Sequence, residues 1–273
     1  MSRNNVSLGS IQETMLLPLW GRAVEMQKEH PMLVDTKAKS IIESIDYDFS
    51  TIEKNIDPLT RAAWIARSLY FDKEISKFQN TYSASSIINV GCGLDTTYDR
   101  INNNRSTWYE IDLPDVIEVR KEYIPESSNR IFIAESVFGN EWYNVIKNKK
   151  NVLILFAGVL YYFEEENIKK LLLKFKENFE NISILFDYCS KKGMELTNKK
   201  VIDSGGMNKE AYLKWSIEDI NELEKWNLSV KVINNMAMFE DYKKNFPVEK
   251  QIGMNIADSM KIMSLAHIEI SGA

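Results

Sequence analysis

The hydrophobic pattern of the chain changes character at about residue 80. Before that point apolar residues recur every three or four positions, as on one face of a helix, over residues 12–29, 35–45 and 60–78. Pro18 is expected to interrupt the first of these helices. Strand-like runs are missing from this part of the sequence. We therefore expect residues 1–80 to form a helical N-terminal cap on a main domain.

From residue 81 onward, short apolar runs alternate with helical patterns. The expected strands are residues 87–90, 106–111, 130–134, 151–156, 182–186, 228–233 and 262–270, and the clearest helical patterns are residues 164–179 and 217–226. Repeated strand–helix units predict an α/β fold with a parallel, Rossmann-like sheet between helices and ligands at the carboxyl ends of the strands. The polar stretch 190–215, with two glycines in a row, predicts a lid or insertion in this domain of residues 81–273.

Composition narrows the function classes. The 273 residues are 44% hydrophobic and carry a formal net charge of -5 with interspersed signs, which gives no support to nucleic-acid or anionic-membrane binding. The apolar runs are shorter than the roughly 20 residues of a membrane helix, and the first residues are too polar for a secretory signal. With two cysteines, expected to be buried thiols, and two histidines, a metal site is not predicted. We expect a cytoplasmic protein, with oligomerisation left open.

The stretch IINVGCGLDTT at residues 87–97 is the first candidate for chemistry. A buried strand ends at Gly91 and Gly93, whose missing side chains let a ligand lie against bare backbone. A dinucleotide-binding turn has a third glycine, but Thr96 stands at that position, and no basic residue follows until Arg100. These features favour a nucleoside cofactor without phosphates, for which S-adenosylmethionine is the obvious choice.

Residues after the next strands fit such a cofactor. Asp112 lies roughly 20 residues after the glycines, where an acid accepts hydrogen bonds from ribose hydroxyls, although a loop or helix-cap acid is the alternative. Residues 135–138 are expected to flank the adenine, with Val137 or Phe138 against the ring and Ser136 or a backbone amide at its polar edge. Gly158 would let backbone approach the cofactor from the other side.

At this point the chain resembles a known family. It is similar to the leucine carboxyl methyltransferases, and in particular to their bacterial polyketide O-methyltransferase (tetracenomycin-type) branch. The matching stretches stand in the family's order and include SIQET at 10–14, DYDF at 46–49, ARS at 66–68, GCGLDT at 91–96, WYEIDLP at 108–114, AGVLYYF at 157–163 and LFD at 185–187. The pairing of Leu-Asp-Thr after the glycines with the later Asp-Leu-Pro is the most telling.

The resemblance implies a class I methyltransferase fold, with a seven-stranded sheet whose last strand is antiparallel, and S-adenosylmethionine as cofactor with S-adenosylhomocysteine as product. It implies that Arg67 pairs with the methionine carboxylate of the cofactor. The other contacts that it implies are to the methionine and ribose from Gly91, Gly93 and Asp95, to the ribose diol from Asp112, to the adenine from Ser136 and Val137, and to the cofactor through the backbone of Ala157 and Gly158.

Departures from the family pattern bear on these contacts, and one of them is Asn89 in place of the acid that often opens the glycine motif. Ala157 replaces the glutamate that many relatives have, so no charge is assigned to that wall. Gly139 stands where many relatives have an acid, so adenine recognition is expected to rest on backbone or on Glu135.

The acceptor is less defined. Tyr161, Tyr162, Met15, Met207 and Trp215 are the candidate walls of its pocket, with Trp20, Met194 and Tyr212 as further possibilities. No catalytic base is assigned, because His30 and His267 both read better as non-catalytic residues. We expect O-methylation of a hydroxyl or carboxylate on a small, apolar or aromatic metabolite. The alternatives are a protein C-terminal carboxyl methyltransferase and a cofactor-binding module without turnover.

Overall fold

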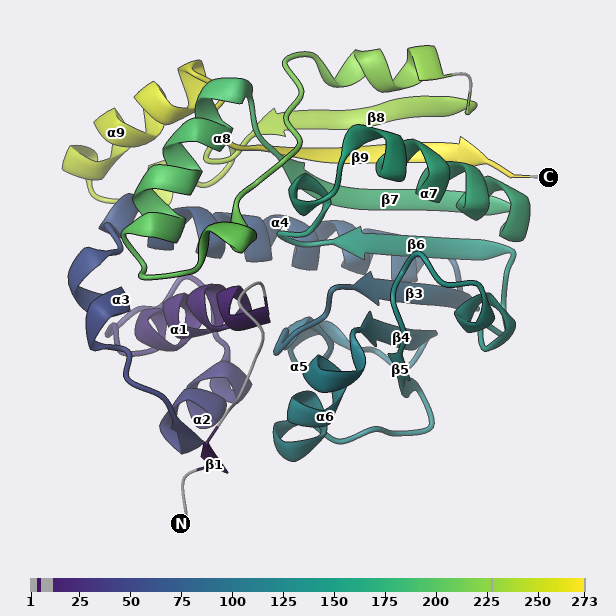
Figure 1. Ribbon diagram of the computed structural model, residues 1–273, viewed down its shortest axis with the longest axis horizontal. Coiled ribbons are helices and arrows are strands. Elements are labelled where there is room, and N and C mark those ends of the chain that lie inside the picture. Colours follow the sequence, from purple (N-terminus) through teal and green to yellow (C-terminus); the bar gives the residue numbers. More distant parts are fainter. Residues whose placement is uncertain (1–3, 6–11, 227, 273) are drawn as a thin grey trace.

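The computed structural model describes residues 4–5, 12–226 and 228–272, and shows a seven-stranded sheet between two layers of helices (Figure 1). The strands are β3 (Ser85–Val90), β4 (Ser106–Asp112), β5 (Arg130–Ala134), β6 (Asn151–Phe156), β7 (Asn181–Tyr188), β8 (Val230–Ala237) and β9 (Ser264–Ser271). Their order is β5-β4-β3-β6-β7-β9-β8, and β9 is antiparallel to both of its neighbours. The predicted α/β fold with an antiparallel last strand is confirmed.

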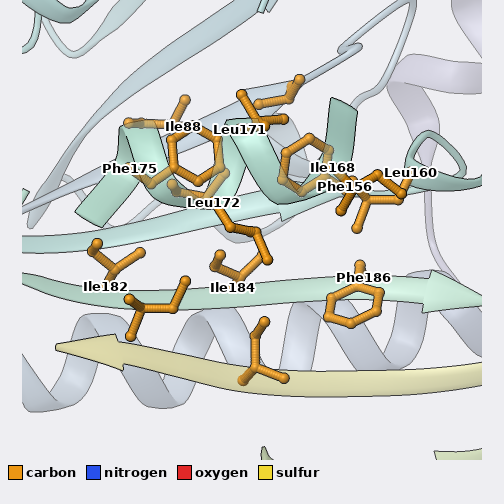
Figure 2. Close-up of a cluster of buried hydrophobic side chains, with 14 of the residues drawn as sticks. Ile88, Phe156, Leu160, Ile168, Leu171, Leu172, Phe175, Ile182, Ile184 and Phe186 are labelled. Carbon is orange, nitrogen blue, oxygen red and sulfur yellow. The ribbon is translucent and has the colours of Figure 1, made fainter. Parts of the chain in front are cut away.

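Alternate residues of the central strands build two separate cores. Ile88, Ile154 and Ile184 face α7 (Glu165–Asn178), whose buried row is Ile168, Leu171, Leu172 and Phe175 (Figure 2). Each of these four α7 side chains contributes about 1.5–3 kcal/mol by leaving water. The helices α5 (Thr97–Ile101) and α6 (Pro114–Tyr123) follow β3 and β4.

The opposite face of the sheet is covered by α4 (Pro58–Thr81), the longest helix of the described residues, which runs behind the strands in Figure 1. Ile87, Leu153 and Leu185 point to this face and pack with Tyr70 and Ile75 of α4. Because side chains alternate along a strand, one apolar run serves both faces, which is why apolar residues are consecutive at 87–88, at 152–156 and at 184–186.

The N-terminal helices precede the sheet. They are α1 (Leu16–Glu25), α2 (Thr36–Ser44), α3 (Ser50–Asn55) and α4, and a minor pair of strands joins β1 (Asn4–Asn5) to β2 (Ile45–Asp46). Pro18 does not interrupt α1, contrary to expectation. It lies in the first turn, where the N–H that proline lacks has no partner within the helix. Leu16 and Leu19 of α1 pack on Cys92 and Leu94 of the glycine turn.

The stretch 190–215 contains α8 (Lys191–Thr197), a single π-helical turn at Asn198–Asp203 and a loop. Ile202 and Met207 from this stretch share a small core with Leu17, Trp20 and Ile52 of the N-terminal helices. The two segments therefore pack against each other across the carboxyl edge of the sheet. Their roles as lid and cap stay predictions, as does the domain boundary near residue 80.

Helix α9 (Val248–Ser259) lies between β8 and β9 and has no counterpart among the sequence predictions. The strand before it, predicted at 228–233, instead runs to Ala237. Cys92 and Cys189 are both buried and free, as predicted. None of the helices within 4–5, 12–226 and 228–272 combines the length and apolarity that a bilayer-spanning segment needs.

Candidate active site

A cavity of about 820 Å³ opens at the carboxyl ends of β3, β4 and β6. Its roof consists of residues from α1, α8 and α9 and from the first turns of α4, all of which lie on that side of the sheet in Figure 1. The residues predicted to bind the cofactor all line it, namely Arg67, Gly91, Gly93, Asp95, Asp112, Ser136, Val137, Ala157 and Gly158. The role of each residue in binding the cofactor remains a prediction. The local geometry shows which atoms of each residue are available for such a contact.

The glycine turn has the backbone conformation that its sequence requires. Gly91 and Gly93 have φ angles of 62° and 44°, in the left-handed region that favours glycine. A Cβ atom on Gly91 would lie 2.7 Å from Cγ2 of Val159, and one on Gly93 would lie 2.8 Å from Cβ of Met15. Met15, predicted as an acceptor wall, thus lies directly over the glycine turn. Both glycines are needed for the conformation and for close packing.

Asp112 ends β4 and faces the same turn. Its Oδ2 accepts a hydrogen bond from the Gly93 N–H at 2.7 Å, and its Oδ1 accepts one from the Leu113 N–H at 2.8 Å. Burial raises the pKa of this carboxyl above its ordinary value. An ionised carboxylate has about four acceptor sites, so two remain for a ribose diol in the cavity. The side chain is therefore held in place by the backbone that the cofactor would touch.

Asp95 has a structural task as well as a place on the wall. Its Oδ1 accepts a hydrogen bond at 2.9 Å from the Thr97 N–H, the first amide of α5. Its Oδ2 accepts a hydrogen bond at 3.1 Å from the Thr97 hydroxyl. Burial opposes ionisation, but the positive charges of Arg22 and Arg100 and the bonds from Thr97 outweigh it and lower the pKa of Asp95 to about 2. The carboxylate is therefore fully ionised at neutral pH.

Arg120 supports the glycine turn from below, a role that the sequence predictions missed. Its guanidinium is fully buried and donates to the carbonyl oxygens of Gly93 at 2.7 Å and Asp95 at 2.9 Å. Glu110 Oε1 lies 2.7 Å from Nη2 and balances the charge. The sequence held one signal for this residue. Arg120 shares the buried face of α6 with Val116 and Ile117, and a buried cation on an apolar helix face requires partners.

Arg67 comes from α4 and reaches the cavity floor at the end of β7. Its Nη1 lies 2.8 Å from Oδ2 of Asp187, whose Oδ1 accepts from the Gly158 N–H at 2.6 Å. Burial disfavours the cation, but Asp187 outweighs it and raises the pKa of Arg67 above its ordinary value. Only Nη1 bonds to Asp187, so other guanidinium donors remain for a ligand carboxylate. Asp187 was not among the predicted site residues, although its LFD motif was noted.

Gly158 is required by that arrangement. Its φ is 82°, and a Cβ atom there would lie 2.7 Å from Arg67 Nη1 and 3.1 Å from the hydroxyl oxygen of Tyr161. The hydroxyl oxygen of Tyr161 accepts a hydrogen bond from the Arg67 guanidinium, and Tyr162 is hydrogen-bonded to Thr14. Burial raises the pKa of both tyrosines. Both hydroxyls are therefore protonated at neutral pH and can act as hydrogen-bond donors.

The loop after β5 forms the end of the cavity predicted to hold the adenine. Val137 lies on the wall with its side chain mostly in the core, and Phe138 packs edge-on against Phe163 with ring centroids 4.8 Å apart. A Cβ atom at Gly139 would overlap Oε1 of Glu135. The Glu135 carboxylate thus occupies the space that a side chain at position 139 would need.

The rest of the cavity, called the arm below, has mainly apolar walls, with Asp57, Lys200 and Asp258 among its polar residues. The apolar walls are formed by Leu59, Ala63 and Trp64 of α4, Leu196, Val201 and Ile202 of the 190–215 stretch, and Gly253, Ile256 and Ala257 of α9. Of the predicted acceptor walls, Tyr161, Tyr162 and Met15 line the cavity.

The prediction that Met207 and Trp215 line the acceptor pocket is wrong, because neither residue belongs to the cavity wall. Met207 is buried with the N-terminal helices, and Trp215 is buried in the α7-side core. Trp20, Met194 and Tyr212 are likewise engaged in packing elsewhere. These methionine and aromatic side chains pack in the core. The local sequence cannot distinguish such a core residue from one that lines a pocket.

Known proteins are similar to this chain in sequence and in fold. A model of the family "Leucine carboxyl methyltransferase" matches residues 16–176. The tetracenomycin polyketide synthesis O-methyltransferase TcmP of Streptomyces glaucescens is 27% identical over 183 residues, which cover 67% of each chain. The S-adenosyl-L-methionine-dependent methyltransferase dpfgK of Gibberella zeae is 24% identical over 266 residues, covering 89% of this chain and 88% of that one.

Solved structures share the fold at low sequence identity. A protein of Thermobifida fusca superposes with a TM-score of 0.58 and 12% identity, covering 93% of this chain and 94% of its own. The plantazolicin methyltransferase BpumL, in complex with a triazolic desmethylPZN analog and S-adenosylhomocysteine, superposes with a TM-score of 0.53 and 14% identity, covering 96% of this chain and all of its own (100%). These two likenesses establish the architecture of the sheet and its helices.

Proposed function

We propose that this protein methylates an oxygen atom of a small, apolar metabolite. The premise is that the chain belongs to the leucine carboxyl methyltransferase family and is an S-adenosylmethionine-dependent methyltransferase. One observation carries the proposal. A single cavity has a guanidinium and a carboxylate beside its bare-backbone glycines and continues as an apolar arm.

The donor set of the cavity matches the groups of the cofactor. A guanidinium is suited to a carboxylate, so Arg67 would hold the methionine end. Asp112 has acceptor sites free for the ribose diol, and the residues from Glu135 to Phe138 would border the adenine. The cofactor, when bound, supplies an electrophilic methyl group on a sulfonium sulfur. The chain's own task is to bind and orient the two reactants so that the acceptor oxygen faces that methyl group.

Few groups on the wall could remove a proton from the acceptor. Histidine is absent from the lining among the residues that the structure describes. Six lining carboxylates each accept a hydrogen bond from a backbone N–H, which weakens them as bases, although Oδ2 of Asp258 has no hydrogen-bond partner within the described part of the chain; they are Asp57, Asp95, Asp112, Glu135, Asp187 and Asp258. The tyrosines are donors. An acceptor that ionises by itself, such as a carboxylic acid or an acidic phenol or enol, needs no base, and we propose that class.

The activity of one relative supports the same proposal. TcmP is an O-methyltransferase of polyketide synthesis, and polyketides include acidic phenols and enols. The apolar arm favours such a ligand over a charged peptide, so a protein C-terminus is the weaker candidate for the acceptor.

Methyl transfer from S-[methyl-¹⁴C]adenosylmethionine to a panel of phenolic and carboxylic small molecules tests the proposal. We expect label in a small-molecule product that forms in proportion to enzyme and that Asp112→Asn forms more slowly when the cofactor is below saturation. Mild base separates the two acceptor types, since esters are hydrolysed and ethers are not. Label that appears only in protein, or only on nitrogen or carbon atoms, would contradict the proposal.

A further inference from the structure

Helix α9 carries a row of apolar side chains on its solvent-exposed face. Val248, Ile252, Ile256 and Met260 are 70%, 62%, 55% and 42% exposed. Residues four apart are neighbours on a helix surface, so Val248, Ile252 and Ile256 of α9 form a continuous row about 12 Å long, and Met260 follows it at the C-cap of the helix. A helix in a folded domain ordinarily buries such a row, while α9 turns Met254 to the core instead.

The row is continuous with the cavity. Ile256 and Met260 are both exposed to solvent and part of the cavity lining. Between them and the arm, α9 presents Gly253 and Ala257 to the cavity, two residues with little or no side chain. A Cβ atom at Gly253 would come no closer than 3.8 Å, an ordinary contact distance, to Leu59 Cδ2, which itself lines the cavity. From Ile256 the row continues outward for about 12 Å, to Val248.

The row is too narrow for a protein partner. Exposed polar residues border it, among them Glu249, Lys250, Asn255 and Ser259. A stable protein interface buries about 800 Å² on each partner, which needs a broad patch of side chains. A single narrow row matches a slender apolar ligand.

We propose that the exposed row of α9 is the outer part of the acceptor site and binds an apolar extension of the methyl acceptor. The acceptor would place its reacting oxygen inside the cavity and its extension, an alkyl or similarly slender chain, across Ile256 and Ile252 toward Val248. The inference rests on the proposed function. It adds a length requirement, because a compact acceptor would leave the row uncovered.

A homologous series of 4-alkylphenols, from methyl to octyl, tests the row in the presence of S-adenosylhomocysteine. Each methylene that becomes buried should tighten binding roughly fourfold. We expect the wild type to gain affinity along the series and the double variant Val248→Ser, Ile252→Ser to lose about tenfold with the octyl member. Binding of the methyl member should stay unchanged. Val34→Ser is the matched control, since Val34 is 61% exposed and outside the cavity wall.

The outcomes are distinguishable. A chain-length dependence that is the same in the wild type and the double variant would overturn the proposed row and leave the proposed function standing. A concentration-dependent dimer in sedimentation velocity that the double variant abolishes would also overturn it, in favour of contact between copies. Absence of binding by every phenol, and by the matching series of alkanoic acids, would contradict the proposed function and the row together.

Discussion

Arg67 and Asp187 form a buried ion pair between the long N-terminal helix α4 and the end of β7, with Nη1 and Oδ2 2.8 Å apart. Asp187 is fully buried and also binds the Gly158 N–H, so one carboxylate positions both a guanidinium and the turn after β6. The pair joins residues 120 positions apart in the sequence and faces the cavity.

Asp187→Asn should destabilise the protein by about 3 kcal/mol, because it leaves a buried cation without its counter-charge. Urea unfolding measures the change. Asp241→Asn is the control, since it removes the partner of Lys73 from an exposed pair of similar length and should cost less than about 1 kcal/mol. Equal losses in the two variants would show that the buried pair has no special weight.

Arg67→Met should weaken S-adenosylhomocysteine binding by about tenfold or more, because a charge-assisted hydrogen bond is lost. Binding of 5′-methylthioadenosine, which lacks the amino-acid carboxylate, should not change. Calorimetry with both ligands gives the ratio. If both affinities fall together, Arg67 does not bind the carboxylate end.

Asp112→Asn should weaken both of those ligands by about tenfold, since each carries the ribose diol that the carboxylate would accept from. The contrast with Arg67→Met separates the two ends of the site within one experiment. Unchanged binding in Asp112→Asn would show that the ribose does not lie beside Asp112 at the end of β4.

Gly158→Ala should lower stability by about 1–3 kcal/mol and abolish cofactor binding, because its φ of 82° and its 2.7 Å approach to Arg67 exclude a Cβ atom. Gly253→Ala is the matched control. Gly253 lies in α9, where a Cβ atom would make only an ordinary contact with Leu59 at 3.8 Å, so Gly253→Ala should raise stability by about 0.5–1 kcal/mol and leave cofactor affinity intact. Thermal melts with and without S-adenosylhomocysteine record both effects.

Asp95→Asn should cost about 2 kcal/mol at pH 7 and progressively less in acid. The folded-state pKa of about 2 lies below the ordinary value of 3.8. The carboxylate therefore stabilises the fold at pH values above 3.8, and this stabilisation is lost as the pH falls toward 2. Melting temperatures of wild type and variant should therefore converge between about pH 5 and pH 2. A constant difference over that range would assign the loss to packing.

Local patterns were enough to predict much of the fold. Apolar runs located all seven strands of the sheet, and the glycines of the turn after β3 carry the left-handed conformation expected of them. Other features were missed, among them helices α3 and α6, the place of Pro18 and helix α9. Pro18 reads as an interruption but lies in a first turn, and α9 exposes the row that an amphipathic helix would normally bury.

The sequence by itself determined the strand–helix order, the glycine turn and the family, because these depend on residues that are neighbours along the chain. Only the tertiary structure decided which distant side chains meet: Arg120 under the turn, Asp187 beside Arg67, and Glu135 in the space left by Gly139. It also assigned Met207 and Trp215 to the core. Packing of elements far apart in sequence sets those contacts, and no local pattern encodes the partner of a buried charge or the wall that a methionine joins.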